Sequence, residues 1–188
     1  MAEADAMVDA CEKNGVHFNL GTNRRWNPGY DTMKAVIDSG ELGALRSLII
    51  HDTGTLFNGA SHAFDLVIRL NSDVPATWVQ GHLQDGDDAV QGDRLVLDPV
   101  GHGMIQFENG VTAYALNSGR RSEWEAVCER GVLTSLANGQ EWQMRVVGTP
   151  DHRGRPGLVL GEFPNYERAS SPLRLVEDLV HSLDTGEP

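Results

Sequence analysis

Lysine is scarce in this sequence, since only Lys13 and Lys34 occur among its 188 residues. A reaction that needs a catalytic lysine would have to use one of these two or a lysine outside the chain. Basic residues are few overall, with 15 Lys and Arg against 27 Asp and Glu and a net charge of −12. Because nucleic acids are bound through clustered positive charge, this balance argues against a nucleic-acid partner.

Cysteine and long apolar runs are also sparse. Cys11 and Cys128 form no C-x-x-C spacing, which fits a reducing cytoplasm better than a disulfide framework. No apolar run approaches the ~18 residues of a membrane span. The first residues lack the basic start and apolar run of a signal peptide. We therefore expect a cytoplasmic chain of about one domain that does not contact a membrane.

The first half of the chain carries helical periodicity. Helices are predicted over 3–13, 28–39 and 58–70, with short strands at 16–20 and 45–51. Asn27 can cap the second helix, Pro28 suits its first position and Gly40 ends it. No strand precedes the opening helix and strand, which are therefore typical of the tail of an α/β unit.

The second half changes to the alternation that is typical of β-strands. Strands are predicted at 76–83, 104–108, 111–117, 123–129, 132–137 and 141–147. Asn109-Gly110 and Asn138-Gly139 are strong hairpin signals, so the sheet should be mainly antiparallel. Loops are predicted at 84–101 and 149–171, and a last helix is predicted at 171–186. This order predicts an α+β fold, a mainly antiparallel open sheet with helices on one face.

The helix predicted at 58–70 carries the most informative residues. Four polar residues share one narrow face of it: Asn58, His62, Asp65 and Arg69. Three apolar residues lie opposite and are expected to pack on the sheet: Phe57, Phe64 and Ile68. Histidine is the natural general acid or base near neutral pH, and polar neighbours can orient it. The alternative is an ordinary amphipathic helix with a solvated polar face.

Other candidates are weaker. Arg24 and Arg25 follow the strand predicted at 16–20 and could hold an anion or a hydroxylated substrate, or could be ordinary surface arginines. Gly101-His102-Gly103 starts like a dinucleotide fingerprint, but it lacks the last glycine and leads into a strand, so it is predicted to be a β-loop. Five residues could be imagined as metal ligands: His51, Asp52, His62, Asp65 and His82. No metal-binding spacing joins them, so no metal is assigned.

Four stretches in order carry a family likeness. They are GTNRRWNP at 21–28 running on to IDSGELG at 37–43, NGASHAFD at 58–65, IQFENGV at 105–111, and VHSL at 180–183 running on to GEP at 186–188. Together they resemble the Gfo/Idh/MocA family of NAD(P)-dependent oxidoreductases, which act largely on sugars, inositols and related polyols. No single stretch is highly specific, but their ordered sum covers nearly the whole chain.

The resemblance implies a missing part. Family members begin with a Rossmann domain that holds a glycine-rich turn and a Glu-Lys-Pro motif, whose lysine helps catalysis. Glu12-Lys13-Asn14 is not that motif, because it lies inside a predicted helix and lacks the proline. Residues 1–22 are therefore expected to be a remnant of the dinucleotide-binding domain. Residues 23–188 would be the substrate-binding and oligomerisation domain, and NAD or NADP would be bound mainly by the absent domain.

The resemblance also assigns roles to residues. His62 would be the catalytic acid or base for a substrate hydroxyl. Asn58 stands where the family commonly has Asp, so it could hydrogen-bond a hydroxyl but could not take its proton. Arg24 and Arg25 match the family's basic motif near the nicotinamide and the substrate, with Arg24 also on the cofactor side. Asp65 would orient neighbouring groups on the substrate side.

Two functions from different classes follow from this reading. The leading hypothesis is a fragment of an NAD(P)-dependent oxidoreductase that acts on a polyhydroxylated small molecule and is inactive alone. The alternative is a non-catalytic binding or oligomerisation module, in which the open face of the sheet is covered by another copy of the chain. A metal-assisted hydrolase or isomerase ranks last.

Overall fold

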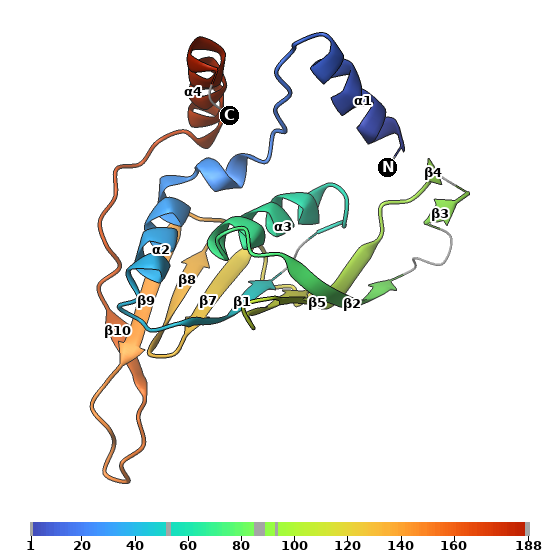
Figure 1. Cartoon of the computed structure of the whole chain (residues 1–188). Helices are drawn as coiled ribbons and strands as arrows, with labels where there is room; N and C mark the ends of the chain where they lie inside the picture. Colours follow the sequence, from blue (N-terminus) through green and yellow to red (C-terminus); the bar gives the residue numbers. More distant parts are fainter. Residues whose placement is uncertain (1, 52–53, 85–88, 93, 187–188) are drawn as a thin grey trace.

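The computed structural model describes residues 2–51, 54–84, 89–92 and 94–186. Its centre is one open sheet of eight strands, in the order β10-β9-β8-β7-β1-β6-β5-β2 (Figure 1). These strands are β1 (Leu45–His51), β2 (Ala76–Gln84), β5 (Val100–Phe107), β6 (Thr112–Leu116), β7 (Glu123–Cys128), β8 (Gly131–Leu136), β9 (Glu141–Val147) and β10 (Leu158–Gly161). All neighbouring strands are antiparallel except β1 and β6. The predicted α+β fold with a mainly antiparallel open sheet is therefore confirmed.

Helices α2 (Pro28–Ser39) and α3 (Gly59–Leu70) cover one face of this sheet (Figure 1). The 3-10 helix η1 (Asn23–Trp26) leads into α2, while α1 (Ala2–Lys13) and α4 (Ser171–Thr185) stand beyond this helical layer. In the part of the chain that is described, no helix lies on the opposite face. None of these helices has the length and apolar character needed to cross a bilayer.

Local sequence explains where α2 begins and ends. The side-chain oxygen of Asn27 accepts a hydrogen bond from the Gly29 N–H at 2.9 Å, and Pro28 occupies the first turn. Gly40 ends the helix in the left-handed conformation at φ 70°. Both predicted Asn-Gly hairpins also form, with Gly110 at φ 84° and Gly139 at φ 80°.

The core lies between this helical layer and the sheet. The buried residues of α2 and α3 pack against inward-facing residues of β1, β7 and β8, a set that includes Tyr30, Met33, Leu66, Leu70, Leu48, Ile50, Trp124, Ala126 and Leu133. Burial of such side chains contributes roughly 1.5–3 kcal/mol each, which holds α3 rigidly on the sheet. The predicted packing of Phe57 and Ile68 is wrong, since they are 59% and 43% exposed. Small residues such as Ala60 and Ala63 occupy the sheet-facing side instead and allow close approach.

Three other expectations differ from the structure. The strand predicted at 16–20 is not formed, because no described strand lies beside it to complete a ladder. The loop predicted at 149–171 contains β10, a short edge strand without alternation that pairs with β9. The loop predicted at 84–101 contains the ribbon of β3 (Val90–Gln91) and β4 (Arg94–Leu95) and the start of β5, and its residues 85–88 and 93 lie outside the described residues.

Candidate functional site

A polar cavity of about 290 Å³ forms where η1, α2, α3, the β8–β9 turn and the start of α4 meet. It brings together Arg24 and His62, two of the predicted site residues. Amide side chains form much of the remaining lining: Asn23, Asn27, Asn138 and Gln140. Amides donate and accept hydrogen bonds at once, so this lining suits a ligand with several hydroxyl groups.

His62 is half-buried on α3 and lines this cavity. Its Nδ1 atom is buried and has no hydrogen-bond partner among the described residues. A buried polar atom without a partner costs about 1–3 kcal/mol, and such atoms often mark a functional site. An imidazole placed in this way can exchange a proton with a ligand hydroxyl.

The N-terminus of α3 is held by Asp98, which the sequence did not single out. Its carboxylate accepts hydrogen bonds from the N–H groups of Phe57 and Asn58 at 2.8 and 3.0 Å. Loss of hydration opposes the charge on Asp98, but these bonds and one from Thr55 outweigh it and lower the pKa of the carboxyl. Asp98 therefore fixes the end of the helix that presents His62.

The two neighbouring arginines have different surroundings. Arg25 makes a bidentate ion pair with Asp65, with Nε–Oδ2 and Nη2–Oδ1 distances of 2.9 Å, which ties η1 to α3. Arg24 instead lies with its guanidinium carbon 5.8 Å from the centroid of the Trp124 ring, and its Nη2 is 3.5 Å from Ser122 Oγ. Within the described residues, no carboxylate pairs with Arg24. Only Arg24 of the predicted pair lines the cavity.

A second ion-pair cluster joins the helices around the cavity. Asp31 on α2 accepts from Arg69 on α3 and from Arg174 on α4, with Arg174 Nη1 at 2.5 Å from Asp31 Oδ2. Arg174 Nη1 also donates to the carbonyl of Trp26 at 2.9 Å. Two arginines around one carboxylate thus lock α4 against η1.

Tyr30 is a cavity residue that sequence reasoning missed as a polar group. It lines the cavity, and its hydroxyl lies 3.1 Å from Ser135 Oγ. Burial raises the pKa of the phenol, although Ser135 and Arg24 act in the opposite direction. Tyr30 therefore keeps its proton and can donate a hydrogen bond.

Other predicted residues lie outside the cavity. Asn58 is exposed at the start of α3, where its backbone N–H is bonded to Asp98. His51 is buried on the open side of the sheet, with Nδ1 3.0 Å from Ser118 Oγ. Among the described residues, no three His, Cys, Asp or Glu side chains are grouped so that they could hold a metal ion, and Asp52 lies outside those residues.

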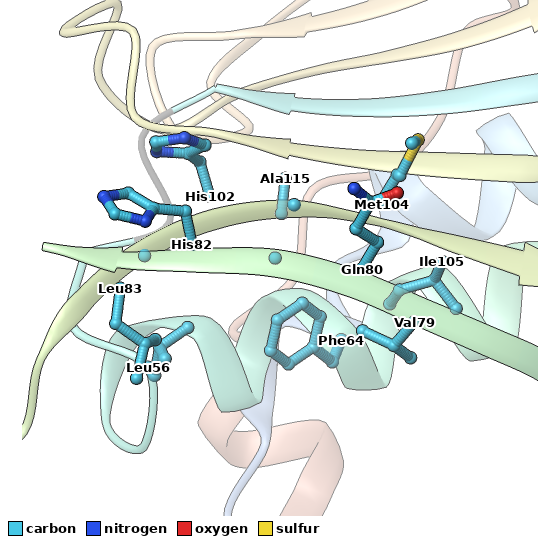
Figure 2. Close-up of a pocket in the computed structure, with 13 residues that line it drawn as sticks. Leu56, Phe64, Val79, Gln80, His82, Leu83, His102, Met104, Ile105 and Ala115 are labelled. Atoms are coloured by element: carbon cyan, nitrogen blue, oxygen red, sulfur yellow. The ribbon is translucent and has the colours of Figure 1, made fainter. Parts of the chain in front are cut away.

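A second cavity, of about 360 Å³, lies on the other side of α3 and is almost wholly apolar. Figure 2 shows Leu56, Phe64 and Leu83 on the α3 side of the strands, while His82 and His102 project from the opposite side. Its floor is glycine-rich, because the Gly101-His102-Gly103 segment belongs to β5 and not to the predicted loop. No titratable side chain labelled there enters it, so it offers no acid–base chemistry.

Comparison with known proteins adds the context of the fold. No protein-family model and no curated protein matches the sequence. The structure is similar to an aldose-aldose oxidoreductase from Caulobacter crescentus complexed with glycerol, with 17% identity, a TM-score of 0.72 and coverage of 99% of this chain and 59% of the other. It is also similar to an Agrobacterium radiobacter oxidoreductase in complex with NAD+, L-tartaric acid and magnesium, with 16% identity, a TM-score of 0.59 and coverage of 98% and 60%.

A third similar structure is a super-repressor mutant of Gal80p from Saccharomyces cerevisiae, with 14% identity, a TM-score of 0.67 and coverage of 97% and 55%. The chain thus spans somewhat over half the length of each of these proteins. At such low identity the likeness shows the fold alone, and one fold can host several functions. The chain has the fold of Gfo/Idh/MocA-type oxidoreductases.

Proposed function

We propose that this chain is the substrate-binding part of an NAD(P)-dependent oxidoreductase that acts on a sugar, inositol or related polyol. The observation that carries the proposal is the polar cavity that His62, Arg24 and Tyr30 line together. Its amide-rich lining suits hydroxyl groups, and its place is on the rigid helical layer of a fold shared with oxidoreductases. The resemblance of the sequence to Gfo/Idh/MocA enzymes supports the same assignment.

In this proposal His62 moves a proton. The imidazole takes the proton from the substrate hydroxyl at the carbon that is oxidised, and returns it in the reverse reaction. Tyr30 and the cavity amides hold the remaining hydroxyls, which fixes the position of the reacting carbon. Asn58 is placed outside this cavity, so its proposed contact with a substrate hydroxyl requires a ligand that extends beyond the cavity. Asp65 acts through Arg25 by positioning η1, and neither residue lines the cavity.

The hydride acceptor would be a nicotinamide, which supplies the oxidation chemistry when it is bound. The described residues do not fit its phosphates, because Gly101-His102-Gly103 lies within a strand and opens no helix. We therefore place NAD or NADP mainly on a further domain, with Arg24 on the side of the cavity where the nicotinamide and the substrate would meet. Neither Lys13 nor Lys34 lines the cavity, so the chain supplies no lysine to the site.

The proposed domain boundary follows the exposure of the first residues. Residues 1–22 would be the remnant of the dinucleotide-binding domain, and 23–188 the substrate-binding and oligomerisation domain. Val16, Phe18 and Leu20 are 58%, 49% and 66% exposed, and α1 stands away from the sheet in Figure 1. Apolar side chains in such a run are usually covered by a partner surface. The 188-residue chain alone is therefore expected to be inactive.

The test measures reduction of NAD+ and NADP+ with a panel of sugars and polyols. It uses the 188-residue chain and any longer reading frame that contains it. In the longer protein, His62→Ala should lower kcat/KM by about 10²–10⁴-fold, whereas His152→Ala, at an exposed position outside the cavity, should leave it unchanged. Unchanged turnover in His62→Ala would remove the catalytic assignment. A longer protein that binds neither dinucleotide would contradict the oxidoreductase proposal.

The second candidate function is a non-catalytic module that assembles through the open sheet face. That face carries a shallow groove of about 310 Å³ lined by residues that include His82, His102, Met104 and Tyr114, and Trp78 on the same face is 45% exposed. A homo-oligomer through this face is part of both proposals. Light scattering should therefore report a dimer or larger species, which Trp78→Glu should convert to monomer. Only the module proposal predicts that His62→Ala has no functional effect.

A further inference from the structure

We propose that the ligand of the polar cavity carries a carboxylate, which Arg24 binds, so that the substrate class is a sugar acid and not a neutral polyol. This inference deepens the proposed function and rests on it. It concerns the charge of the substrate, whereas the proposed function concerns the site and the reaction.

The first observation is the charge of the cavity. Arg24 is the one formally charged side chain of its described lining, although the whole chain has a net charge of −12. The neighbouring arginines each pair with a carboxylate, Arg25 with Asp65, while Arg69 and Arg174 share Asp31. A guanidinium that is partly removed from water is stabilised by an anionic partner. Among the described residues, no Asp or Glu side chain pairs with Arg24. We therefore infer that the anion that pairs with Arg24 belongs to the ligand.

The second observation is how Arg24 is held. Its guanidinium carbon lies 5.8 Å from the Trp124 ring centroid, within the range of a cation–π contact. Its hydrogen bond to Ser122 Oγ is long at 3.5 Å, and its guanidinium also acts on the Tyr30 hydroxyl. A guanidinium held through its face keeps N–H donors available, and two of them match the two oxygens of a carboxylate. Tyr30, whose hydroxyl lies 3.1 Å from Ser135 Oγ, lines the same cavity.

Charge and size favour a carboxylate over a phosphate. One guanidinium balances one negative charge, whereas a phosphate monoester carries about −1.5 to −2 at neutral pH. The volume of about 290 Å³ is at the lower end of the range for ligand pockets, which fits a monosaccharide and not a nucleotide. Apart from Pro172, the remaining lining is amide, phenol, hydroxyl and imidazole, which suits the hydroxyl groups of a sugar acid.

The experiment measures ligand affinity for the 188-residue chain by thermal stabilisation and calorimetry. Each probe pair differs only in one terminal group: D-gluconate with sorbitol, D-galactonate with galactitol, and D-mannonate with mannitol. Sorbitol 6-phosphate is the phosphate probe. Arg24→Gln removes the proposed contact. Arg153→Gln is the matched control, because it makes the same change in net charge at an exposed position outside the cavity.

At least one acid should bind at least about tenfold more tightly than its polyol, a difference of about 1.4 kcal/mol. Arg24→Gln should abolish that preference, whereas Arg153→Gln should keep it. Added salt should weaken binding of the acid but not binding of the polyol. The inference is overturned if each polyol matches its acid, if Arg24→Gln leaves the preference intact, if the phosphate binds best, or if no acid binds. A polyol that binds as tightly as its acid would not contradict the proposed function, because the proposed function is tested by the turnover of the His62 variant.

Discussion

The bidentate ion pair between Arg25 and Asp65 should stabilise the fold more than an ordinary surface pair does. Both N–O distances are 2.9 Å, and the side chains are only 32% and 21% exposed. Exposed pairs couple by about 0.2–1 kcal/mol, and breaking fully buried pairs costs about 3–5 kcal/mol. The intermediate burial of this pair therefore places its coupling free energy at about 1–2 kcal/mol.

A double-mutant cycle measures this coupling. Arg25→Ala, Asp65→Ala and the double variant are unfolded in urea, and the four tryptophans report the transition. The double variant should be hardly less stable than either single variant, because each single change already breaks the pair. Arg46 and Glu129, which form an ion pair with side chains 65% and 39% exposed, provide the control cycle with the weak coupling of an exposed pair. A coupling no larger than that of the control pair would contradict the role of Asp65 in holding Arg25 and η1 in place.

Three further predictions concern packing, thiol reactivity and pH. Gly29→Ala should destabilise the fold by about 1–3 kcal/mol, because the Cβ of the alanine would lie 2.2 Å from Trp142 Cζ2. Gly21→Ala, whose Cβ would have no atom within 4 Å, should be nearly neutral in the same urea titration. Burial, with a smaller effect of the neighbouring glutamate, raises the pKa of the Cys128 thiol to about 11. A thiol reagent near neutral pH should therefore not label Cys128 until urea unfolds the chain. Mass spectrometry would measure this labelling. The lowered pKa of Asp98 means that its carboxylate stabilises the fold above its unfolded pKa of about 4 and loses this effect as the pH falls through the folded pKa. The unfolding free energy of Asp98→Asn should therefore decline less on acidification than that of the unaltered chain.

Local signals in the sequence predicted most of the elements. Asn27 and Gly40 marked the ends of α2, and the caps and turns that they form depend on neighbouring residues only. The two Asn-Gly pairs marked hairpins for the same reason. Elements that depend on distant partners were less predictable. The strand at 16–20 has a strand-like pattern but no described neighbour, whereas β10 has little pattern and forms because β9 is beside it.

In the candidate site too, local features could be predicted from the sequence, whereas features that depend on tertiary contacts could not. The sequence predicted that His62 lies on a helix with a polar face, which follows from helical spacing. It could not distinguish Arg24 from Arg25, because the difference lies in the tertiary contacts of one with Trp124 and of the other with Asp65. The cavity also takes residues from the β8–β9 turn, which the sequence marked only as a turn. Convergence of separate elements is a property of packing, and no local pattern carries it.

The polar cavity around His62 should be the place where a small molecule binds. Histidine-selective NMR of the 188-residue chain, titrated with the acids and polyols named above, tests this directly, with the His62 resonance assigned from a His62→Gln variant. A bound ligand should shift the resonance of His62, while the resonances of His82 and His102, on the open face of the sheet, should stay in place. Shifts confined to His82 and His102, or an unmoved His62 at saturating ligand, would contradict it.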